Sequence, residues 1–226
     1  IVAGINAALK CGGSEPLVMK RDESYIGVLI DDLCTCGVDE PYRMFTSRAE
    51  YRILLRQDDA DARLTERSYQ LGLATRERYD WWKEKETAIG RIVEFCQQTS
   101  VKPSEVNDAL ERFGSTPLRT GCKLSELVCR PQLSLEKLKP IFPGLAELMD
   151  APKNRKEEIA EAAEIKMKYK GYIERERIVA EKMHRLEDIK IKGHFNYEHL
   201  HELSTECRQK LKAINPDTLG QASRIP

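Results

Sequence analysis

The sequence predicts a mainly α-helical protein, built of packed short helices and a long helix or helical hairpin, with a small mixed α/β connector near the N-terminus. Two observations carry this prediction. Beyond Gly72, apolar residues recur at helical spacing, in segments that begin at capping residues or prolines. Between residues 153 and 189, apolar residues recur at seven-residue steps, at Ile165, Tyr172, Val179 and Leu186. Both patterns are typical of helices that pack against one another.

The front of the chain, residues 1–72, has weaker patterns. It begins with IVAGINAALK, which is typical of the end of a helix, and continues into a Gly-Gly-Ser-Glu-Pro loop. From Asp22 we expect a short helix that ends before Gly37, because glycine commonly stops helices. The stretch Glu50–Arg56 fits either a short strand or a helical turn, and its apolar residues favour a little β structure.

The middle of the chain predicts one longer helix followed by several short ones. Thr75 can cap a helix that runs through Trp81 and Trp82 to about Thr99, with an apolar stripe on one side. Shorter helices are expected to start near Pro103, Ser125 and Ser134. Further prolines separate these short helices, at Pro117, Pro131, Pro140, Pro143 and Pro152.

The last part of the chain contains the seven-residue recurrence, which Tyr169 and Met183 extend. We interpret it as a packing seam between helices rather than a binding site, and Gly171 as a kink or a close helix crossing.

Two further elements follow Gly193. Ser204 can cap a helix that Pro216 ends, and the stretch Thr218–Ile225 predicts a short helical turn. Within that turn, Gln221, Ser223 and Arg224 suit either a phosphate contact or a small helix–helix contact with a partner or with a further C-terminal helix. We divide the chain into the stretches 1–20, 21–72, 73–152 and 153–226.

Composition and charge limit the classes of function. Of the 226 residues, 41% are hydrophobic and 33% are charged, which is typical of a globular chain. Because no apolar run of membrane-spanning length and no signal-peptide pattern occur, we expect no membrane insertion and a cytoplasmic location. The formal net charge is zero, which argues against a uniformly basic nucleic-acid binder. Locally, however, residues 42–57 and 208–224 each carry four cations against one acid.

No metal site is expected in this chain. The seven cysteines include no C-x-x-C pair, and Cys34 and Cys36 lack further ligands at suitable spacing, so reduced thiols are indicated. The histidines of HFNYEHLHELS do not form an H-E-x-x-H helix, and we interpret them as surface or loop-packing residues; they are His194, His199 and His201.

An acidic run, Asp58, Asp59 and Asp61, offers oxygen ligands of the kind that magnesium prefers. Arg56 and Arg63 lie beside it in the sequence, however, and they favour internal ion pairs instead.

The stretch 41–67, PYRMFTSRAEYRILLRQDDADARLTER, is the most informative segment for function. Guanidinium groups bind phosphate oxygens as planar forks and aromatic rings accept unstacked bases, so their mixture here favours a single-stranded or looped nucleic acid. The alternative is a basic surface that pairs with its own acids. The arginines are Arg43, Arg48, Arg52, Arg56, Arg63 and Arg67; the aromatic residues among them are Tyr42, Phe45 and Tyr51; the acids are Glu50, Asp58, Asp59, Asp61 and Glu66.

The same segment carries a family resemblance. DESYIGVLIDDLCTCGVDEPYRMFTSRAEYRILLR and DDADARLTERSYQLGL resemble the junction between the flavin domain and the C-terminal region of the GidA/MnmG family of tRNA uridine 5-carboxymethylaminomethyl modification enzymes. KYKGYIERE and FNYEHLHELSTECRQKLKAINPDTLGQASRI are similar to that family's final helical segment. The resemblance extends over nearly the whole chain.

The resemblance implies an FAD-dependent enzyme that works with a GTPase partner, MnmE. In this scheme the pair adds an aminomethyl or carboxymethylaminomethyl group to carbon 5 of the wobble uridine, with methylenetetrahydrofolate as one-carbon donor and NADH reducing the flavin. The chain has no G-x-G-x-x-G motif, so we expect a C-terminal part of a longer enzyme, with residues 1–20 as the tail of its flavin domain. No catalytic residue and no bound cofactor are then expected here. The enzyme is expected to be a homodimer within a hetero-oligomer.

The resemblance also assigns candidate residues. Arg43 and Arg52 are the first candidates for tRNA contact, followed by Arg48 and Arg56, and partner docking is expected within residues 153–226. Two other interpretations stay open. One is a helical docking module without RNA contact, and the other is a stand-alone helical adaptor unrelated to RNA.

Overall fold

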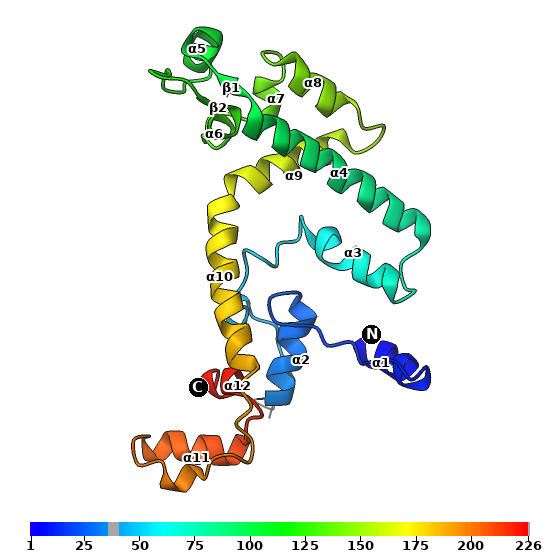
Figure 1. The fold of residues 1–226 in the computed structure, drawn as a ribbon, viewed down its shortest axis with the longest axis vertical. Helices are drawn as coiled ribbons and strands as arrows, with labels where there is room; N and C mark the ends of the chain where they lie inside the picture. The colour runs from blue at the N-terminus through cyan, green and yellow to red at the C-terminus, as the bar shows by residue number, and fades with distance from the viewer. Residues whose placement is uncertain (36–40, 226) are drawn as a thin grey trace. The chain divides into compact units, whose positions relative to one another are not determined.

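The computed structural model describes residues 1–35 and 41–225, and it confirms the mainly α-helical fold. These residues contain twelve α-helices, two short 3-10 helices and one two-stranded ladder (Figure 1). They form two compact units. Unit 1 comprises residues 1–55 together with the chain from Glu174 onward, and unit 2 comprises Arg56–Ile173. The described residues include no helix with both the length and the apolarity that a bilayer span requires.

Unit 2 is built around α4 (Arg76–Gln98), which begins where the sequence predicts. The Thr75 hydroxyl caps it by accepting a 3.3 Å hydrogen bond from the Arg78 backbone N–H. Figure 1 shows its partner helices around it, and α4 packs against α3, α6, α8 and α9. Their bounds are Ala60–Gln70, Leu124–Val128, Pro143–Asp150 and Lys156–Lys168.

Short elements close the far end of unit 2. The strands β1 (Ser100–Val101) and β2 (Cys122–Lys123) form an antiparallel pair on either side of α5 (Pro103–Arg112). After α6 comes α7 (Leu135–Leu138), where the Ser134 hydroxyl accepts a 3.3 Å hydrogen bond from the Lys137 backbone N–H, as predicted. The predicted short helices are therefore confirmed, although α6 begins one residue before Ser125.

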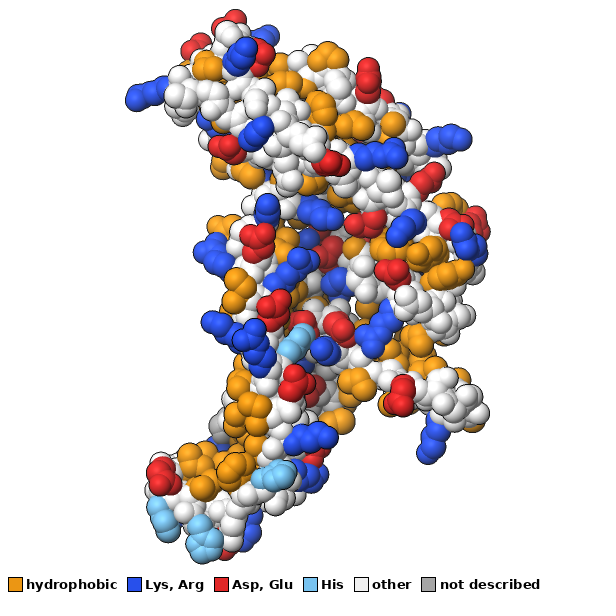
Figure 2. All heavy atoms as spheres, viewed as in Figure 1, with side chains coloured by type: hydrophobic (Ala, Val, Ile, Leu, Met, Phe, Trp, Pro, Cys, Tyr) orange, Lys and Arg blue, Asp and Glu red, His pale blue; other side chains and the backbone are white. Residues whose placement is uncertain are grey.

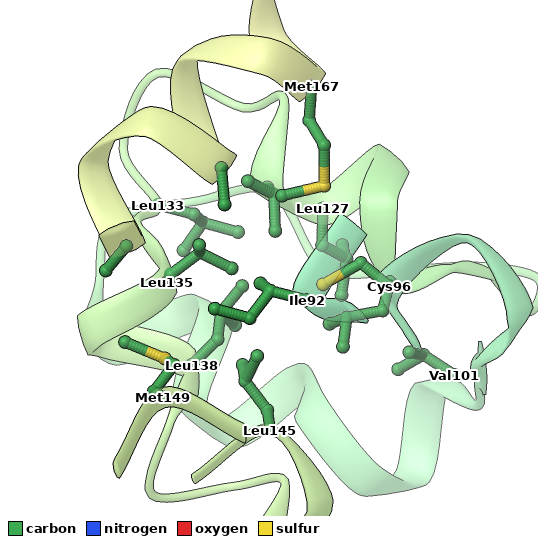
Figure 3. Packing of buried hydrophobic residues seen from close by; sticks show 14 of the residues in the cluster. Ile92, Cys96, Val101, Leu127, Leu133, Leu135, Leu138, Leu145, Met149 and Met167 are labelled. Atoms are coloured by element: carbon green, nitrogen blue, oxygen red, sulfur yellow. The ribbon is translucent and has the colours of Figure 1, made fainter. Parts of the chain in front are cut away.

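The core of unit 2 is a single apolar cluster. Figure 3 shows Ile92 of α4 facing leucines from three short helices, Leu127, Leu138 and Leu145, all of which are fully buried. Burial of each such side chain stabilises the fold by roughly 1.5–3 kcal/mol. The apolar stripe of α4 thus forms the core, with one exception. Trp82 faces inward, but the side chain of Trp81 is 54% exposed, so its predicted place in the stripe is wrong.

The long apolar pattern after residue 153 forms two consecutive helices, α9 and α10 (Lys170–Glu187). The break falls at Tyr169 and not at Gly171. Apart from the backbone of its own helix, no atom of the described residues lies close enough to Gly171 for a tight helix crossing. The predicted packing seam is wrong for much of its length, because Tyr169, Tyr172 and Val179 are about half exposed.

Unit 1 gathers segments from both ends of the chain. It contains α1 (Val2–Cys11), α2 (Tyr25–Thr35) and the 3-10 helix η1 (Thr46–Arg48). From the C-terminal end it contains the rest of α10, η2 (Tyr197–His199), α11 (Thr205–Ile214) and α12 (Leu219–Ser223). The predicted cap of α11 is confirmed, since Ser204 accepts from the Cys207 backbone N–H. The predicted short helical turn is present as α12, and Thr218 caps it by accepting from the Gln221 backbone N–H.

α12 is held by backbone contacts with the residues that follow α10. Lys190 pairs with Thr218 in an isolated antiparallel bridge, and the Leu219 backbone N–H donates to the Ile189 carbonyl at 2.9 Å. At Gly220, an added Cβ would lie 2.7 Å from the Glu187 carboxylate, so a larger residue there would require the Glu187 side chain to move.

Two local features of the front segment differ from expectation. The β structure expected at Glu50–Arg56 is wrong: the Leu54 and Leu55 backbone N–H groups donate to the Tyr51 carbonyl at 2.9 and 3.1 Å, which closes a helical turn instead. Helix α3 was not expected, because its sequence is mostly polar and shows little apolar periodicity.

Candidate nucleic-acid interface

The segment Pro41–Leu55 belongs to unit 1 and is anchored by three buried apolar side chains near its end. Ala49, Tyr51 and Leu55 are buried, and Ala49 and Leu55 pack with Val28 of α2 in a small core. Just before these anchors, η1 is closed by a 3.0 Å hydrogen bond from the Arg48 backbone N–H to the Phe45 carbonyl. The side chains of residues 43–48, Glu50 and Arg52 are exposed, whereas Ile53 and Leu54 are partly buried.

A buried arginine holds this segment in place. The side chain of Arg21 is only 11% exposed, and its guanidinium pairs with Asp31 at 2.9 Å, Asp32 at 2.6 Å and Glu50 at 2.8 Å. It also donates a 2.9 Å hydrogen bond to the Arg48 carbonyl. Arg21 thus joins α2 to the backbone and side chains of the segment.

Asp32 accepts a second set of contacts on its other oxygen. The Tyr42 hydroxyl donates to Asp32 Oδ2 at 2.6 Å, and an Arg48 guanidinium nitrogen lies 3.5 Å from the same oxygen. The Arg48 guanidinium also lies over the Tyr42 ring, 5.1 Å from its centroid, at a distance that suits a cation–π contact. We call Arg21, Asp32, Tyr42 and Arg48 the ionic lock.

The lock shifts the pKa values of its own members. Burial raises the pKa of Tyr42, and the hydrogen bond to Asp32 raises it further, to about 12. Burial alone would raise the pKa of Asp32, but the hydrogen bonds from Tyr42 and Arg21 outweigh it, and the pKa is lowered. The carboxylate is therefore charged at neutral pH and holds both arginines.

The four arginines singled out in the sequence have different surroundings. Arg43 and Arg52 are exposed, and no ion pair joins either of them to another residue of the described ranges. Arg48 is 45% exposed and forms an ion pair with Asp32. Arg56 is 19% exposed and pairs with Asp58 and Asp59, both at 3.1 Å. Arg43 and Arg52 thus have the open surroundings that an RNA contact needs, whereas Arg56 is engaged within the chain.

The acidic run forms the internal ion pairs that the sequence favoured. In addition to Arg56, Arg63 pairs with Asp59 at 2.9 Å. Asp61 instead contacts the buried Lys85 of α4 at 2.8 Å, and Lys85 also contacts Glu158 of α9 at 2.7 Å. The run therefore ties α3, α4 and α9 together.

The basic stretch near the C-terminus, residues 208–224, also forms ion pairs within the chain. Arg224 is 14% exposed, lies 3.2 Å from Asp31 and pairs with Glu187. This intramolecular contact of Arg224 is neither of the two contacts that the sequence suggested for its turn. Figure 2 shows basic and acidic side chains interspersed on the face in view, so the cationic sites are local.

The cysteines and histidines that the sequence singled out were considered as metal ligands. Cys34 is exposed, Cys36 lies outside the described residues, and the three histidines of the cluster are exposed. No grouping of three or more potential metal ligands occurs in residues 1–35 and 41–225.

Sequence reasoning missed Arg21 and Asp32, which position the segment. Asp32 lies 11 residues from Arg21 and 10 from Tyr42, and Glu50 lies 29 from Arg21. Such a network follows no helical or strand period, so spacing in the sequence could not reveal it. The one available signal was the Asp31-Asp32 pair, which is unusual in an otherwise apolar helix.

Comparison with known proteins places the chain in context. Residues 76–177 match a family model described as the tRNA modifying enzyme MnmG/GidA C-terminal helical domain, and residues 179–226 match its C-terminal helical bundle. The tRNA uridine 5-carboxymethylaminomethyl modification enzyme MnmG of Parabacteroides distasonis is 61% identical over the whole chain, and that of Porphyromonas gingivalis is 51% identical.

Two solved structures of GidA are also similar to this chain. Aquifex aeolicus GidA in its form II crystal is 42% identical and superposes with a TM-score of 0.73 over 99% of this chain, which is 34% of the GidA chain. The form I crystal gives 41% identity and a TM-score of 0.69, covering 99% of this chain and 33% of the GidA chain. The chain spans 36% of the length of the two curated relatives.

Proposed function

Because the chain belongs to the MnmG/GidA family, we propose that it supplies tRNA and partner contacts to a longer tRNA-modifying enzyme. In the scheme that the family implies, this enzyme uses FAD and NADH. It acts with the GTPase MnmE in the cytoplasm to place an aminomethyl or carboxymethylaminomethyl group on carbon 5 of the wobble uridine.

The residues of this chain do not fit an FAD site. Such sites cradle the pyrophosphate at a Gly-rich turn between a strand and a helix. Within the described ranges the ladder strands are two residues long, and β2 leads directly into α6 without a glycine turn. We therefore derive no chemical step here and propose that the flavin chemistry belongs to the rest of the enzyme.

One observation carries the RNA-binding proposal. Arg43 and Arg52 are exposed and lack internal ion pairs in the described chain, and the 54% exposed ring of Phe45 lies in the same anchored segment. A guanidinium can clamp a phosphate or stack under an extruded base, and it does not deprotonate at these pH values. The two arginines are thus binding residues and not acid–base catalysts.

The ionic lock supports this role through pre-organisation. Arg21 fixes the Arg48 carbonyl and Asp32 fixes Tyr42, so the segment is ordered before RNA arrives. Ordering a loop during binding would cost free energy that a fixed loop avoids. Arg48, with its long contact to Asp32, is the next candidate for a phosphate contact.

Substitution of the two exposed arginines tests the proposal. In the natural full-length protein, Arg43→Ala or Arg52→Ala should weaken tRNA binding roughly tenfold, which is about 1.4 kcal/mol. Loss of one phosphate contact should also reduce the slope of log K against log salt by about 0.7 to 1. Filter-binding titrations at several salt concentrations measure both quantities.

Arg112→Ala is the matched control. Arg112 is an exposed arginine at the end of α5, so this variant removes the same charge outside the segment. Its affinity and salt slope should remain those of the wild type. An unchanged slope in both Arg43→Ala and Arg52→Ala would contradict the assignment.

A second candidate function is protein docking without RNA contact. The observation that favours it is the apolar surface of α10, where Tyr172, Ile178 and Val179 are each about half exposed. If this region only binds the GTPase partner, the 226-residue chain alone will not bind tRNA at moderate salt. Measurable tRNA binding by the chain would favour the RNA-contact proposal.

The family scheme also implies a homodimeric enzyme within a hetero-oligomer. Sedimentation of the full-length protein, alone and with MnmE, tests this expectation.

A further inference from the structure

A groove in unit 2 lies outside the segment described above. It runs between α4 and the connection from α8 to α9, and it has a volume of about 700 Å³. Ala88, Leu148 and Ile159 contribute apolar surface to it, and Trp81 also lines it. Nothing in the proposed role of Arg43 and Arg52 uses this groove.

The two neighbouring tryptophans of α4 have opposite surroundings. Trp82 is 9% exposed and packs against the Tyr79 ring at 5.4 Å between centroids. Trp81 is 54% exposed, although burial of an indole is strongly favourable. A large flat ring therefore stays open to solvent beside a groove, as in surfaces on which nucleic-acid bases stack.

A second planar group lies over this ring. The Arg155 guanidinium is 5.9 Å from the centroid of Trp81. Arg155 also has left-handed backbone angles, with φ 57° and ψ 34°, directly before α9. This conformation costs a non-glycine residue free energy, and such residues concentrate at ligand-binding sites. The backbone strain and the exposed indole therefore occur at the same place.

The charge of the groove favours an anionic ligand. Six cations against four acids are present when the lining residues are counted together with their ion-pair partners Arg76, Asp61 and Glu158. Arg91 and Lys153 are exposed at the groove, and neither has an ion pair with any residue that the structure describes. Two exposed cations at the groove are thus available to phosphates.

We propose that this groove binds a single-stranded stretch of tRNA, with a base stacked on Trp81 and phosphates at Arg91 and Lys153. The inference rests on the proposed tRNA-binding function and adds a second contact site to it. An acidic peptide would also meet the charge, but an exposed indole paired with a guanidinium offers more to a planar base than to a carboxylate chain.

Aromatic substitutions in the natural full-length protein test the stacking contact. With intact tRNA and with a fluorescent eight-nucleotide uridine oligonucleotide as probes, Trp81→Ala should weaken binding at least fivefold. Its salt slope should not change, because no charge is lost. Trp81→Phe should retain most of the affinity. Phe195→Ala, which removes a 52% exposed ring elsewhere, is the control and should bind as the wild type does.

Removal of charge tests the phosphate contacts. Lys153→Ala should weaken binding and lower the salt slope by about 0.7, whereas Arg112→Ala should not. Unaltered binding by both Trp81→Ala and Lys153→Ala would overturn the groove proposal. So would displacement of the oligonucleotide by polyglutamate with equal strength in the wild type and Trp81→Ala.

The groove proposal and the proposed function fail in different ways. If the wild type binds tRNA and Arg43→Ala weakens binding while neither Trp81→Ala nor Lys153→Ala does, only the groove proposal is wrong. If the wild type binds no tRNA, the proposed function itself is wrong.

Discussion

At the scale of single residues, Asp32 decides how the candidate RNA-binding segment is held. Its two oxygens receive Arg21 at 2.6 Å, the Tyr42 hydroxyl at 2.6 Å and Arg48 at 3.5 Å. Removal of one member of a buried charged network leaves part of the remaining charge uncompensated, which costs more than the net value of the intact network. The lock is therefore a set of mutually dependent contacts.

Asp32→Asn is expected to destabilise unit 1 by roughly 3 kcal/mol, because Arg21 and Arg48 lose their shared carboxylate. Urea unfolding followed by circular dichroism measures the change, and hydrogen exchange of peptides covering 41–55 should quicken. Tyr42→Phe removes only the hydroxyl donor and should cost about 1 kcal/mol. The exposed Asp188 offers a control, since Asp188→Asn should change neither quantity. Equal stability of Asp32→Asn and wild type would show that the lock is not structural.

Acid should weaken the same contacts. The pKa of Asp32 is lower in the folded state than its usual value of about 3.9. Its contribution to stability is therefore fully present above about pH 4 and is lost as the pH falls through the lower pKa of the folded state. Thermal unfolding of the wild type between about pH 6 and pH 3 should show this loss, and Asp32→Asn should lack that part of the pH dependence. Identical pH profiles for the two proteins would rule out this coupling.

At the scale of elements, helix starts are predictable because capping is local. Thr75, Ser134, Ser204 and Thr218 each accept a hydrogen bond from a backbone N–H three residues later, so the signal and its partner lie within one turn. α3 was missed because its polar sequence contains no comparable apolar pattern.

Burial was harder to predict, because it depends on distant partners. Trp81 and Trp82 are adjacent and equally apolar, yet only one faces the core. Along α10, the seven-residue recurrence is present, but no helix of the described chain covers Tyr172 or Val179. In the candidate site, exposure of Arg43 and Arg52 agrees with the motif, whereas the lock depends on residues with no regular spacing.

The core prediction belongs to this scale. Ile92→Ala should destabilise unit 2 by about 3 kcal/mol, through lost burial and a residual cavity among the leucines of α6, α7 and α8. The two tryptophans of the chain are both in α4, so their fluorescence during urea unfolding reports on this unit. Lys170→Ala, at an exposed site, should stay within about 0.5 kcal/mol of the wild type. A change of similar size in both variants would argue against α4 as the centre of the core.

The exposed apolar surface of α10 leads to a binding prediction. Val179→Asp places a charge on a half-exposed site, so it should leave stability within about 0.5 kcal/mol but weaken association with the GTPase partner at least tenfold. Titration calorimetry with purified MnmE measures the association. Glu181→Ala, at an exposed polar site two residues away, is the control. If Val179→Asp binds MnmE as strongly as the wild type does, this surface is not the docking site for the partner.

At the scale of the whole molecule, charge balance limits the strength of RNA binding. The formal net charge is zero, and many arginines and lysines are neutralised by nearby acids, such as Arg56 and Lys85. Under the proposed function, the RNA affinity of this chain comes from a few open cations and not from a general basic field. The salt dependence of binding should accordingly be modest, corresponding to a small number of phosphate contacts.

The most direct test of the central claim is a map of photochemical crosslinks between tRNA and the natural full-length protein, read by mass spectrometry of crosslinked peptides. If the segment Pro41–Leu55 grips the RNA, crosslinked nucleotides will appear on peptides that contain Arg43, Phe45 or Arg52. These crosslinks will decline when both arginines are replaced by alanine. Crosslinks confined to other parts of the protein, with none between residues 41 and 55, would contradict the account.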